Sequence, residues 1–556
     1  MLMTAQKRFS ILLVGLILAV TASAFSPCLQ NDFLSEWDDN VHLTGNPLVR
    51  SLSLANIKEI FLQYVNGTYN PLTILSFALE YHFFRYDPFV YHLNNILLHL
   101  GVTALVFVFA RQAGLSWWAA ALASLLFGIH PMHVESVAWV TERKDVLYAF
   151  FYMSALCVWW RYLDSGKLTL FAATFLLGLL SMLAKPMALS LPWILLLVDR
   201  LHGRKFTRRV FLEKIPFLLY AIPLTAITYW VHMRVPGQDP LEAVLLWAWS
   251  LVFYIRQFFL PFVLIPLYPV PEPVAFSQID YGISVSAAAA LIYLLWRFRH
   301  HRFVSFAGLF FLGSVFFLLR YDTTVDVSFV ADRFMYLPSL GFCLLLGAAG
   351  ERALAWGRAR GRMRVLGVTV AIFALIAAGA VKTYHQCGVW KNGITLWAYV
   401  IRQNEASALA YNNRGCAYMD LGKNNLALQD FNQAIRLDPR EAKSYYNKGN
   451  LYKKIGLLKK ALGNYNQAVS IEPGYLFVYN NRGGVYSRLG NYRAAILDFD
   501  RAIYLNPNDP KHYYNRGLTY YRMKRPDLAA QDFERAREMV AKGFPIYYEE
   551  QRAFRF

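Results

Sequence analysis

Apolar runs that are long enough, or nearly long enough, to cross about 30 Å of hydrocarbon recur along the first 381 residues. Only 17% of all residues are charged, against about 25% in soluble domains, so a single soluble globular enzyme is a poor expectation. The sequence instead predicts a polytopic, all-α membrane bundle of about eleven spans: 9–26, 89–110, 115–130, 146–163, 168–183, 186–198, 215–232, 282–296, 303–319, 334–350 and 365–381.

The orientation of this bundle follows from its basic loops. Lysine and arginine concentrate in loops 199–214, 297–302 and 351–364, and Lys7 and Arg8 precede the first span. Cytoplasmic loops of membrane proteins carry this excess of positive charge. We therefore expect the amino terminus inside and the carboxyl terminus outside.

Two segments allow more than one interpretation. The stretch 241–265 is apolar but contains Arg256 and Pro261. Loops 199–214 and 297–302 can lie on the same side only if an even number of spans separates them, and spans 215–232 and 282–296 already make two. We therefore predict that this stretch does not cross the membrane but lies in the interface or re-enters. Residues 7–24 also fit a cleavable signal peptide, because basic residues precede an apolar core that ends in small residues.

The last part of the chain has a different composition. Residues 405–556 hold 39 of the 92 charged residues, which indicates a water-soluble segment. The net charge of the whole chain is +20, and this soluble part contains no dense basic block, so nucleic acid is not an expected partner. The five cysteines share no close spacing, which argues against a disulfide framework or a zinc motif.

Self-comparison of this soluble part gives a period of 34 residues. An Asn-(Arg/Lys)-Gly triplet begins at residues 413, 447, 481 and 515, and a proline closes the first three units at 439, 473 and 507. This is the tetratricopeptide pattern of paired helices. The predicted organisation is a membrane domain at 1–389 with an outer loop at 27–88, a connector helix at 390–407, four repeats forming an α-solenoid at 408–541, and a tail at 542–556.

A helical repeat array presents a concave groove, and the asparagine of each triplet lies on its first helix. Side-chain amides both donate and accept hydrogen bonds, so these asparagines are expected to hold a peptide backbone: Asn413, Asn447, Asn481 and Asn515. The alternative is that they are solvated or cap local turns. The basic residues that follow them are expected on solvated faces: Arg414, Lys448, Arg482 and Arg516.

The predicted outer loops carry the candidate chemistry. Asp38 and Asp39 follow the first span, and paired carboxylates beside the bilayer suit a general base or a metal site, although a solvated turn is an ordinary alternative. His130, His133 and Glu135 lie within six residues. They suit a polar active-site wall or, less well, a divalent metal site, because Pro131 interrupts helical spacing.

Two cations lie at the ends of predicted spans. Lys185 either snorkels to the interface or meets an anionic headgroup. Arg333 suits a lipid-linked phosphate because its planar fork binds two oxygens, and the alternative is an ion pair with Asp332 or Asp326.

Together these elements resemble the transmembrane and tetratricopeptide repeat O-mannosyltransferases, and a bacterial-type relative more than an animal one because the array is short. The resemblance rests on the acidic pair in the first outer loop and on four further motifs: His-Pro-Met-His-Val-Glu-Ser-Val at 130–137 with Glu-Arg-Lys-Asp at 142–145, Lys185-Pro186 before an apolar run ending in Asp199, Asp-Arg-Phe-Met-Tyr-Leu-Pro-Ser-Leu-Gly at 332–341, and Trp-Lys-Asn-Gly-Ile-Thr-Leu-Trp at 390–397.

The resemblance implies a GT-C glycosyltransferase that takes a sugar from a polyprenyl phosphate with inversion. Asp38 or Asp39, with Asp39 favoured, would remove the proton of a Ser/Thr hydroxyl. The resemblance also implies substrate-binding roles: His133 and Glu135 would orient sugar or acceptor, Lys185 and Arg333 would neutralise the leaving phosphate, and His130, Arg143, Asp145, Asp332 and Tyr336 would complete the site. The family commonly has Gly-Arg-Ala-Asp at 142–145, so Glu142 and Lys144 are departures that put the sugar specificity in doubt.

The expected function is therefore transfer of a hexose, mannose first, to proteins outside the cytoplasm of a bacterial inner membrane, with the repeats on the periplasmic side. The expected partners are the lipid-linked sugar, an acceptor peptide in the repeat groove and membrane lipid, and a divalent metal is possible. The runner-up is a non-enzymatic membrane scaffold. A lipid-sugar transporter is weaker because no paired charges appear in the middle of a predicted span.

Overall fold

The computed structural model describes residues 2–65, 67–230, 239–319 and 329–541. Within these ranges every extended regular element is a helix, and the only β-type pairing is an isolated bridge between Val65 and Thr68. The predicted all-α fold class is confirmed. The chain divides into two compact units, one made of Met1–Phe33 and Leu52–Lys391 and the other of Leu34–Ser51 and Asn392–Phe556.

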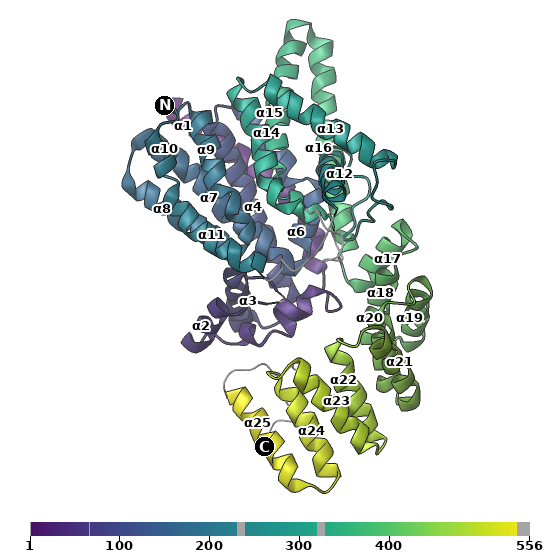
Figure 1. Ribbon diagram of the computed structural model, residues 1–556. Helices are drawn as coiled ribbons and strands as arrows, with labels where there is room; N and C mark the ends of the chain where they lie inside the picture. Colours follow the sequence, from purple (N-terminus) through teal and green to yellow (C-terminus); the bar gives the residue numbers. More distant parts are fainter. Residues whose placement is uncertain (1, 66, 231–238, 320–328, 542–556) are drawn as a thin grey trace. The chain divides into compact units, whose positions relative to one another are not determined.

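The first unit is a bundle of helices (Figure 1). Its helices are α1 (Leu2–Phe25), α2 (Leu54–Leu62), α3 (Pro71–Phe84), α4 (Pro88–Gln112), α5 (Trp117–Gly128), α6 (Val134–Ala138), α7 (Arg143–Ser165), α8 (Leu168–Ala184), α9 (Leu191–His202), α10 (Arg208–Leu212), α11 (Ile215–Trp230), α12 (Pro240–Phe259), α13 (Ile279–Arg297), α14 (Arg302–Val315), α15 (Leu340–Ala359) and α16 (Arg362–Val389). Short 3-10 turns connect several of them, among them η1 (Ser26–Gln30), η5 (Val140–Glu142), η6 (Pro186–Ser190) and η8 (Asp332–Met335).

Six helical segments in the described ranges are long and apolar enough to cross a membrane: Phe9–Gln30, Pro88–Gln112, Val140–Ser165, Pro240–Phe259, Ile279–Arg297 and Arg362–Val389. Three shorter apolar helices accompany them: Trp117–Gly128, Leu168–Ala184 and Arg302–Leu318. The stretch expected to lie in the interface, 241–265, contains α12, which meets the length and composition of a span. Its interfacial placement remains a prediction.

Two predicted spans begin later than expected. The helices begin at Leu191 rather than 186 and at Leu340 rather than 334. In both places a proline precedes the helix, at Pro186 and Pro338. Proline lacks an N–H donor and disfavours the α conformation in the preceding residue, so the chain forms a short turn before each helix starts.

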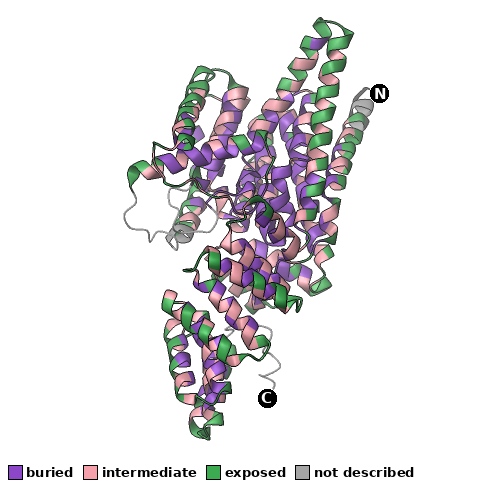
Figure 2. Ribbon diagram, turned by 90° about the vertical axis from the view of Figure 1, so that its right-hand side faces the viewer, coloured by how far each residue is buried: buried purple, intermediate pink, exposed green. Residues whose placement is uncertain are grey.

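Burial in the bundle matches a membrane protein. Figure 2 shows buried residues concentrated inside the bundle and exposed residues along its outermost helices. Leu12 on α1, Ile292 on α13 and Phe373 on α16 are large apolar side chains that are exposed. Contiguous exposed apolar faces of this kind suit contact with lipid.

The second unit contains a connector helix and four helix pairs. The connector is α17 (Gly393–Gln403), and the pairs are α18 (Ala408–Asp420) with α19 (Asn424–Leu437), α20 (Ala442–Lys454) with α21 (Leu458–Ile471), α22 (Leu476–Arg488) with α23 (Tyr492–Leu505), and α24 (Pro510–Arg522) with α25 (Pro526–Ala541). First helices start 34 residues apart, and so do second helices. The predicted period is confirmed.

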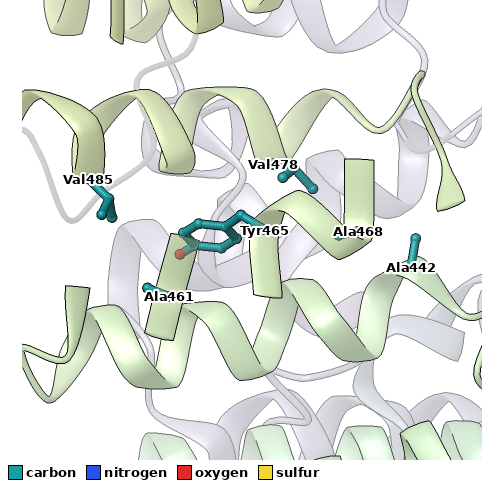
Figure 3. Packing of buried hydrophobic residues seen from close by; sticks show 6 residues of the cluster. All are labelled: Ala442, Ala461, Tyr465, Ala468, Val478 and Val485. Carbon is teal, nitrogen blue, oxygen red and sulfur yellow. The ribbon is translucent and has the colours of Figure 1, made fainter. Parts of the chain in front are cut away.

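Each pair is closed by a glycine on the first helix and an aromatic ring on the second. A Cβ atom placed on Gly415, Gly449, Gly483 or Gly517 would come within 2.5–3.0 Å of that ring, so only glycine allows this approach. Figure 3 shows how neighbouring pairs share a core. Tyr465 of α21 is fully buried among Ala442 of α20 and Val478 and Val485 of α22. Each repeat therefore buries its apolar face on the next.

Candidate functional site

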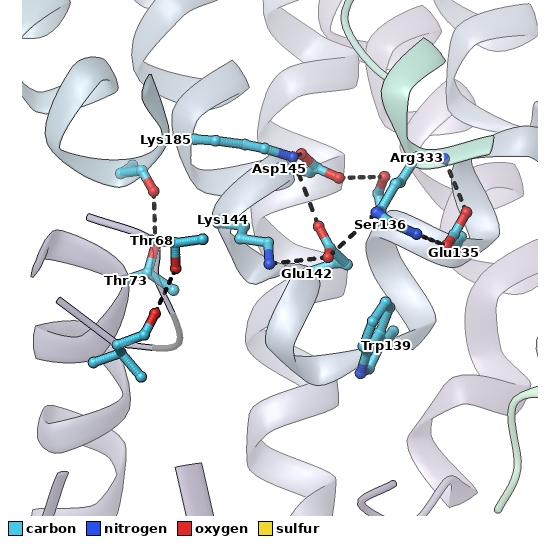
Figure 4. A network of polar contacts seen from close by, with 12 residues as sticks. Thr68, Thr73, Glu135, Ser136, Trp139, Glu142, Lys144, Asp145, Lys185 and Arg333 are labelled. Atoms are coloured by element: carbon cyan, nitrogen blue, oxygen red, sulfur yellow. Dashed lines mark hydrogen bonds and ion pairs between the residues drawn. The ribbon is translucent and has the colours of Figure 1, made fainter. Parts of the chain in front are cut away.

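A buried network of opposite charges lies in the first unit, built from three separate segments (Figure 4). Arg333 in η8 binds Glu135 in α6 twice. Its Nη1 lies 2.5 Å from Oε1, and its backbone N–H donates to Oε2 at 3.0 Å. Its Nε also lies 3.5 Å from Oε1 of Glu142. Arg333 therefore joins η8 to the segment that holds α6 and η5.

Glu142 connects this pair to two lysines. Lys144 Nζ lies 3.0 Å from Oε1 of Glu142, and Lys185 Nζ lies 3.7 Å from Oε2. Lys185 also forms an ion pair with Asp145, whose other oxygen accepts from Ser136 Oγ at 3.0 Å. Three carboxylates and three cations thus form one continuous cluster.

The carboxylates and the cations of the cluster differ in their exposure to solvent. The carboxylates of Glu135, Glu142 and Asp145 are 1–3% exposed, whereas the side chains of Lys185, Lys144 and Arg333 are 9–13% exposed. The cations are therefore the part of the cluster that is more exposed to solvent. Burial opposes the charge of Arg333, but Glu135 and Glu142 more than compensate and raise its pKa above its ordinary value. The arginine stays charged.

Local sequence explains how Lys185 is placed. Pro186 follows it, and Lys185 has the extended backbone that a following proline favours. Helix α8 consequently ends at Ala184, whose carbonyl accepts a hydrogen bond from Thr73 Oγ1 at 3.1 Å. Asp145, the partner of Lys185, lies in the first turn of α7, where the helix dipole favours a carboxylate.

Arg143 is directed away from this cluster. Its Nε donates to Asn95 Oδ1 at 2.7 Å, its Nη2 donates to the Tyr91 carbonyl at 2.7 Å, and its Nη1 pairs with Glu80. All three guanidinium nitrogens therefore hold protein atoms of α3 and α4. Substrate binding by Arg143 stays a prediction, and the geometry favours an anchoring role. Glu80 was missed by sequence reasoning, although an ionisable residue in an apolar helix is a signal for such a site.

His133 and Tyr336 lie in the interior of the bundle. His133 Nδ1 lies 2.8 Å from the Phe127 carbonyl, and its Nε2 lies 2.9 Å from Ser339 Oγ. Tyr336 OH lies 2.7 Å from Nδ1 of His99. These hydrogen bonds tie the turn after η8 to α4 and, through His133, to α5. Contact of either residue with substrate remains a prediction.

His130 also has protein partners. Its ring stacks on Phe258 at a centroid distance of 4.4 Å, and its Nε2 lies 3.1 Å from the Phe258 carbonyl. Glu135, the third residue of this motif, is held by Arg333. In the part of the chain that the structure describes, no group of three or more His, Cys, Asp or Glu residues is placed to hold a metal ion.

Asp332 does not form the ion pair with Arg333 that the sequence allowed as an alternative. Its Oδ2 accepts from Tyr268 OH at 2.7 Å, while Arg333 pairs with Glu135. Burial, with Glu135 nearby, raises the pKa of Asp332 well above its ordinary value. Asp326, the other partner that the sequence allowed, lies outside the described residues.

The acidic pair Asp38 and Asp39, in the predicted first outer loop, belongs to the second unit. Asp39 is buried, and its Oδ2 accepts from the Leu34 N–H at 2.8 Å. Asp38 is half-buried. Because the charged cluster belongs to the first unit, the predicted convergence of Asp38 and Asp39 with His133, Glu135 and Arg333 remains a prediction.

A third acidic residue of this loop was missed. Glu36 Oε1 accepts from Nε1 of Trp397 on the connector helix at 3.2 Å, and Trp37 lies against the same ring at a centroid distance of 4.7 Å. Burial raises the pKa of Glu36 to about 7. The signal that could have found Glu36 is its position next to Trp37, because the predicted connector also carries tryptophan.

The repeat asparagines bridge consecutive repeats. Asn447 Nδ2 donates to Asn412 Oδ1 at 2.9 Å, Asn481 Nδ2 to Tyr446 OH at 2.7 Å, and Asn515 Nδ2 to Asn480 Oδ1 at 3.1 Å. Asn413 Oδ1 accepts from Asn412 Nδ2 at 3.1 Å. The amides thus join the first helices of the array to one another, and their binding of a peptide stays a prediction.

The prediction that the basic residues of the triplets lie on solvated faces is wrong for the arginines. Each arginine forms a two-pronged ion pair with an aspartate sixteen residues later on the second helix: Arg414 with Asp430, Arg482 with Asp498, and Arg516 with Asp532. The planar guanidinium matches a carboxylate. The side chains of the three arginines are only 15–21% exposed. They hold the two helices of a repeat together.

Tetratricopeptide repeat families match residues 415–456, 442–475, 477–509 and 499–531. Among solved structures, a crystal structure of MamA is 25% identical and covers 27% of this chain and 88% of that chain, at a TM-score of 0.26.

Relatives over a longer range are named protein O-mannosyl-transferases. One from Caenorhabditis elegans is 25% identical over 76% of this chain and 62% of its own length. TMTC3 from Homo sapiens is 25% identical over 67% of this chain and 45% of its own length, and Tmtc2 from Drosophila melanogaster is 36% identical over 25% and 16%. The chain spans about half the length of the first two relatives. As the sequence motifs predicted, it is a homologue of the protein O-mannosyl-transferases that carries a tetratricopeptide repeat array.

Proposed function

We propose that this protein is a membrane glycosyltransferase. It moves a hexose, and mannose in particular, from a polyprenyl-phosphate donor to Ser/Thr hydroxyls of proteins on the non-cytoplasmic face of a bacterial inner membrane. The observation that carries the proposal is the charge cluster, in which Lys185 and Arg333 are ordered by buried carboxylates and are the more exposed part. The names of the relatives favour mannose and a protein acceptor.

The chemistry is a single inverting displacement. A carboxylate of the first outer loop takes the proton of the acceptor hydroxyl, whose oxygen attacks the anomeric carbon. The bond between that carbon and the phosphate oxygen breaks, and the lipid phosphate leaves with the electron pair. Asp39 was favoured as the base from sequence, but its carboxylate is buried and held by Leu34, whereas Asp38 is half-buried. The greater exposure of Asp38 supports this residue as the base in the proposal.

The cluster supplies charge stabilisation to the leaving group. Glu135 and Glu142 fix the guanidinium of Arg333, while Glu142 and Asp145 fix the ammonium of Lys185. Because these cations are held before the substrate arrives, they need little reorganisation as negative charge develops on the phosphate. Fixed charges of this kind are worth about 10²–10³ in rate when one is removed.

The repeat array suits the acceptor side of the reaction. An α-solenoid offers an extended concave surface, and the first helices of this one carry asparagine and tyrosine in every repeat and lysine in two of the four. In this proposal it presents the acceptor polypeptide. A membrane scaffold without enzyme activity is the alternative, and it requires only the array.

The experiment is transfer of labelled mannose from polyprenyl-phosphate mannose to a Ser/Thr-containing protein in proteoliposomes. Replacing both Asp38→Asn and Asp39→Asn should reduce transfer by about 10²-fold or more, as loss of a general base does. Asp32→Asn is the matched control, because Asp32 is an exposed carboxylate of the same loop, and it should retain transfer. Unchanged transfer by the double variant would overturn the base assignment, and absence of transfer by the wild type would favour the scaffold.

A further inference from the structure

Two cysteines that are 359 positions apart in sequence meet in the first unit. Cys28 lies in η1, directly after α1, and Cys387 lies in the last turn of α16. Both are 0% exposed. The thiol of Cys387 lies 3.8 Å from the carbonyl of Ala24, four residues before Cys28, and both thiols are free in this structure.

The backbone around the two thiols is held by contacts that do not involve sulfur. Asn31 Nδ2 donates to the Cys387 carbonyl at 3.3 Å, and the Asn31 N–H donates to the Cys28 carbonyl at 3.1 Å. Next to it, the Asp32 N–H donates to the Lys391 carbonyl at 2.8 Å. These bonds fix the chain after α1 against the end of α16, so the segments that carry Cys28 and Cys387 are held together independently of the two thiols.

The other three cysteines have different surroundings. Cys157 in α7 lies 3.7 Å from the carbonyl of Leu105. Cys343 is buried in α15, and Cys416 belongs to α18 of the second unit. They provide matched controls for the Cys28–Cys387 pair.

We propose that Cys28 and Cys387 form a disulfide bond that links the first and last helices of the membrane bundle. The predicted orientation places both residues at the non-cytoplasmic end, where thiols are oxidised. Each thiol loses its proton, one S–S bond forms, and the two electrons reduce the disulfide of an incoming protein thiol oxidant to two thiols. Because both sulfur atoms are fully buried in the folded unit, the exchange takes place while α16 docks.

The cross-link has a clear physical consequence. It closes almost the whole membrane domain into one loop, which restricts the unfolded chain and so favours the folded one. It also fixes the end of α16 just before residue 392, where the second unit resumes. Sequence spacing excluded a cysteine framework but says nothing about a single bridge between distant residues.

The test counts free thiols in the full-length protein made in a host with an oxidising non-cytoplasmic compartment. The protein is quenched in acid, denatured and tagged with a maleimide, with and without prior reduction. Of five cysteines, three should react before reduction and all five after it. Five reactive thiols before reduction would overturn the proposal, as would a cross-linked peptide that joins any pair other than Cys28 with Cys387.

Two variants complete the test. Cys28→Ser should give four reactive thiols both before and after reduction, because its partner is released. Cys157→Ser should give two before reduction and four after it, because the bond remains. Since the protein is denatured before tagging, the counts do not depend on how well a variant folds. Equal counts before and after reduction for Cys157→Ser would contradict the proposed bridge.

Discussion

Glu142 forms ion pairs with three cations, Lys144, Lys185 and Arg333. Sequence comparison marked Glu142 and Lys144 only as departures from a Gly-Arg-Ala-Asp pattern. The structure shows that these departures compensate each other, because the two side chains pair at 3.0 Å. One acid and one base are added together, so the net charge of the cluster is unchanged.

Arg333→Lys separates the role of the guanidinium fork from that of its charge. The proposed function predicts a fall in kcat/KM of about 10–100-fold, because an ammonium cannot bind two oxygens in a plane. The matched variant is Arg143→Lys, in which the fork is held by protein atoms. It should lower the melting temperature while the folded enzyme retains most of its kcat/KM. Equal losses of kcat/KM in the two variants would contradict the distinction drawn here.

Glu36 makes the second unit sensitive to pH. Its pKa is raised from 4.5 to about 7 by burial, so between these values the folded chain binds a proton that the unfolded chain has lost. Stability should therefore fall as the pH rises from about 4.5 to about 7, by at most about 3 kcal/mol. Chemical unfolding of the full chain, followed through the second unit at several pH values, measures this. Glu36→Gln should flatten the curve, and an unchanged slope would refute the assignment.

Helix pairs of the array differ in one interaction. Three repeats carry the arginine–aspartate pair between their helices, whereas the second repeat has Lys448 and Asn464 at the same two positions. Burial lowers the pKa of Lys448. This fits a half-buried ammonium whose pKa is not raised by a carboxylate. The regular 34-residue period concealed this exception.

Restoring the pair should strengthen the second repeat. In the double variant Lys448→Arg, Asn464→Asp, helices α20 and α21 should gain about 0.5–1.5 kcal/mol, which slows their amide exchange by about 2–10-fold. Hydrogen exchange measured by mass spectrometry gives the rate for each helix. Lys448→Arg alone is the control, since it adds the fork without its partner. Faster exchange in the double variant than in the control would contradict the role given to the ion pair.

At the scale of the whole molecule, local patterns were predicted well and long-range pairs were not. Periodicity gave the helix pairs of the array, and prolines explain why two spans start late. The Glu135–Arg333 bond joins residues 198 positions apart, and the Asn31–Cys387 hydrogen bond joins residues 356 apart. A single sequence carries no signal for such contacts. A charged side chain is equally consistent with solvation, and a cysteine is equally consistent with an isolated thiol.

The predicted orientation can be tested with introduced cysteines. Thr207 lies in the basic loop 199–214 and Ser470 lies on the array, and both are exposed. In intact cells, a membrane-impermeant maleimide should label Ser470→Cys more strongly than the parent protein. Thr207→Cys should gain label only after the membrane is permeabilised. Labelling of Thr207→Cys in intact cells would reverse the proposed topology.

The most direct test of the proposed activity is mass analysis of extracytoplasmic proteins from cells with and without this chain. Hexose on Ser/Thr peptides should disappear when the chain is removed, return when the wild type is restored, and stay absent or greatly reduced with Arg333→Lys made at the same level. Hexose that persists at the same sites without the chain would contradict the account.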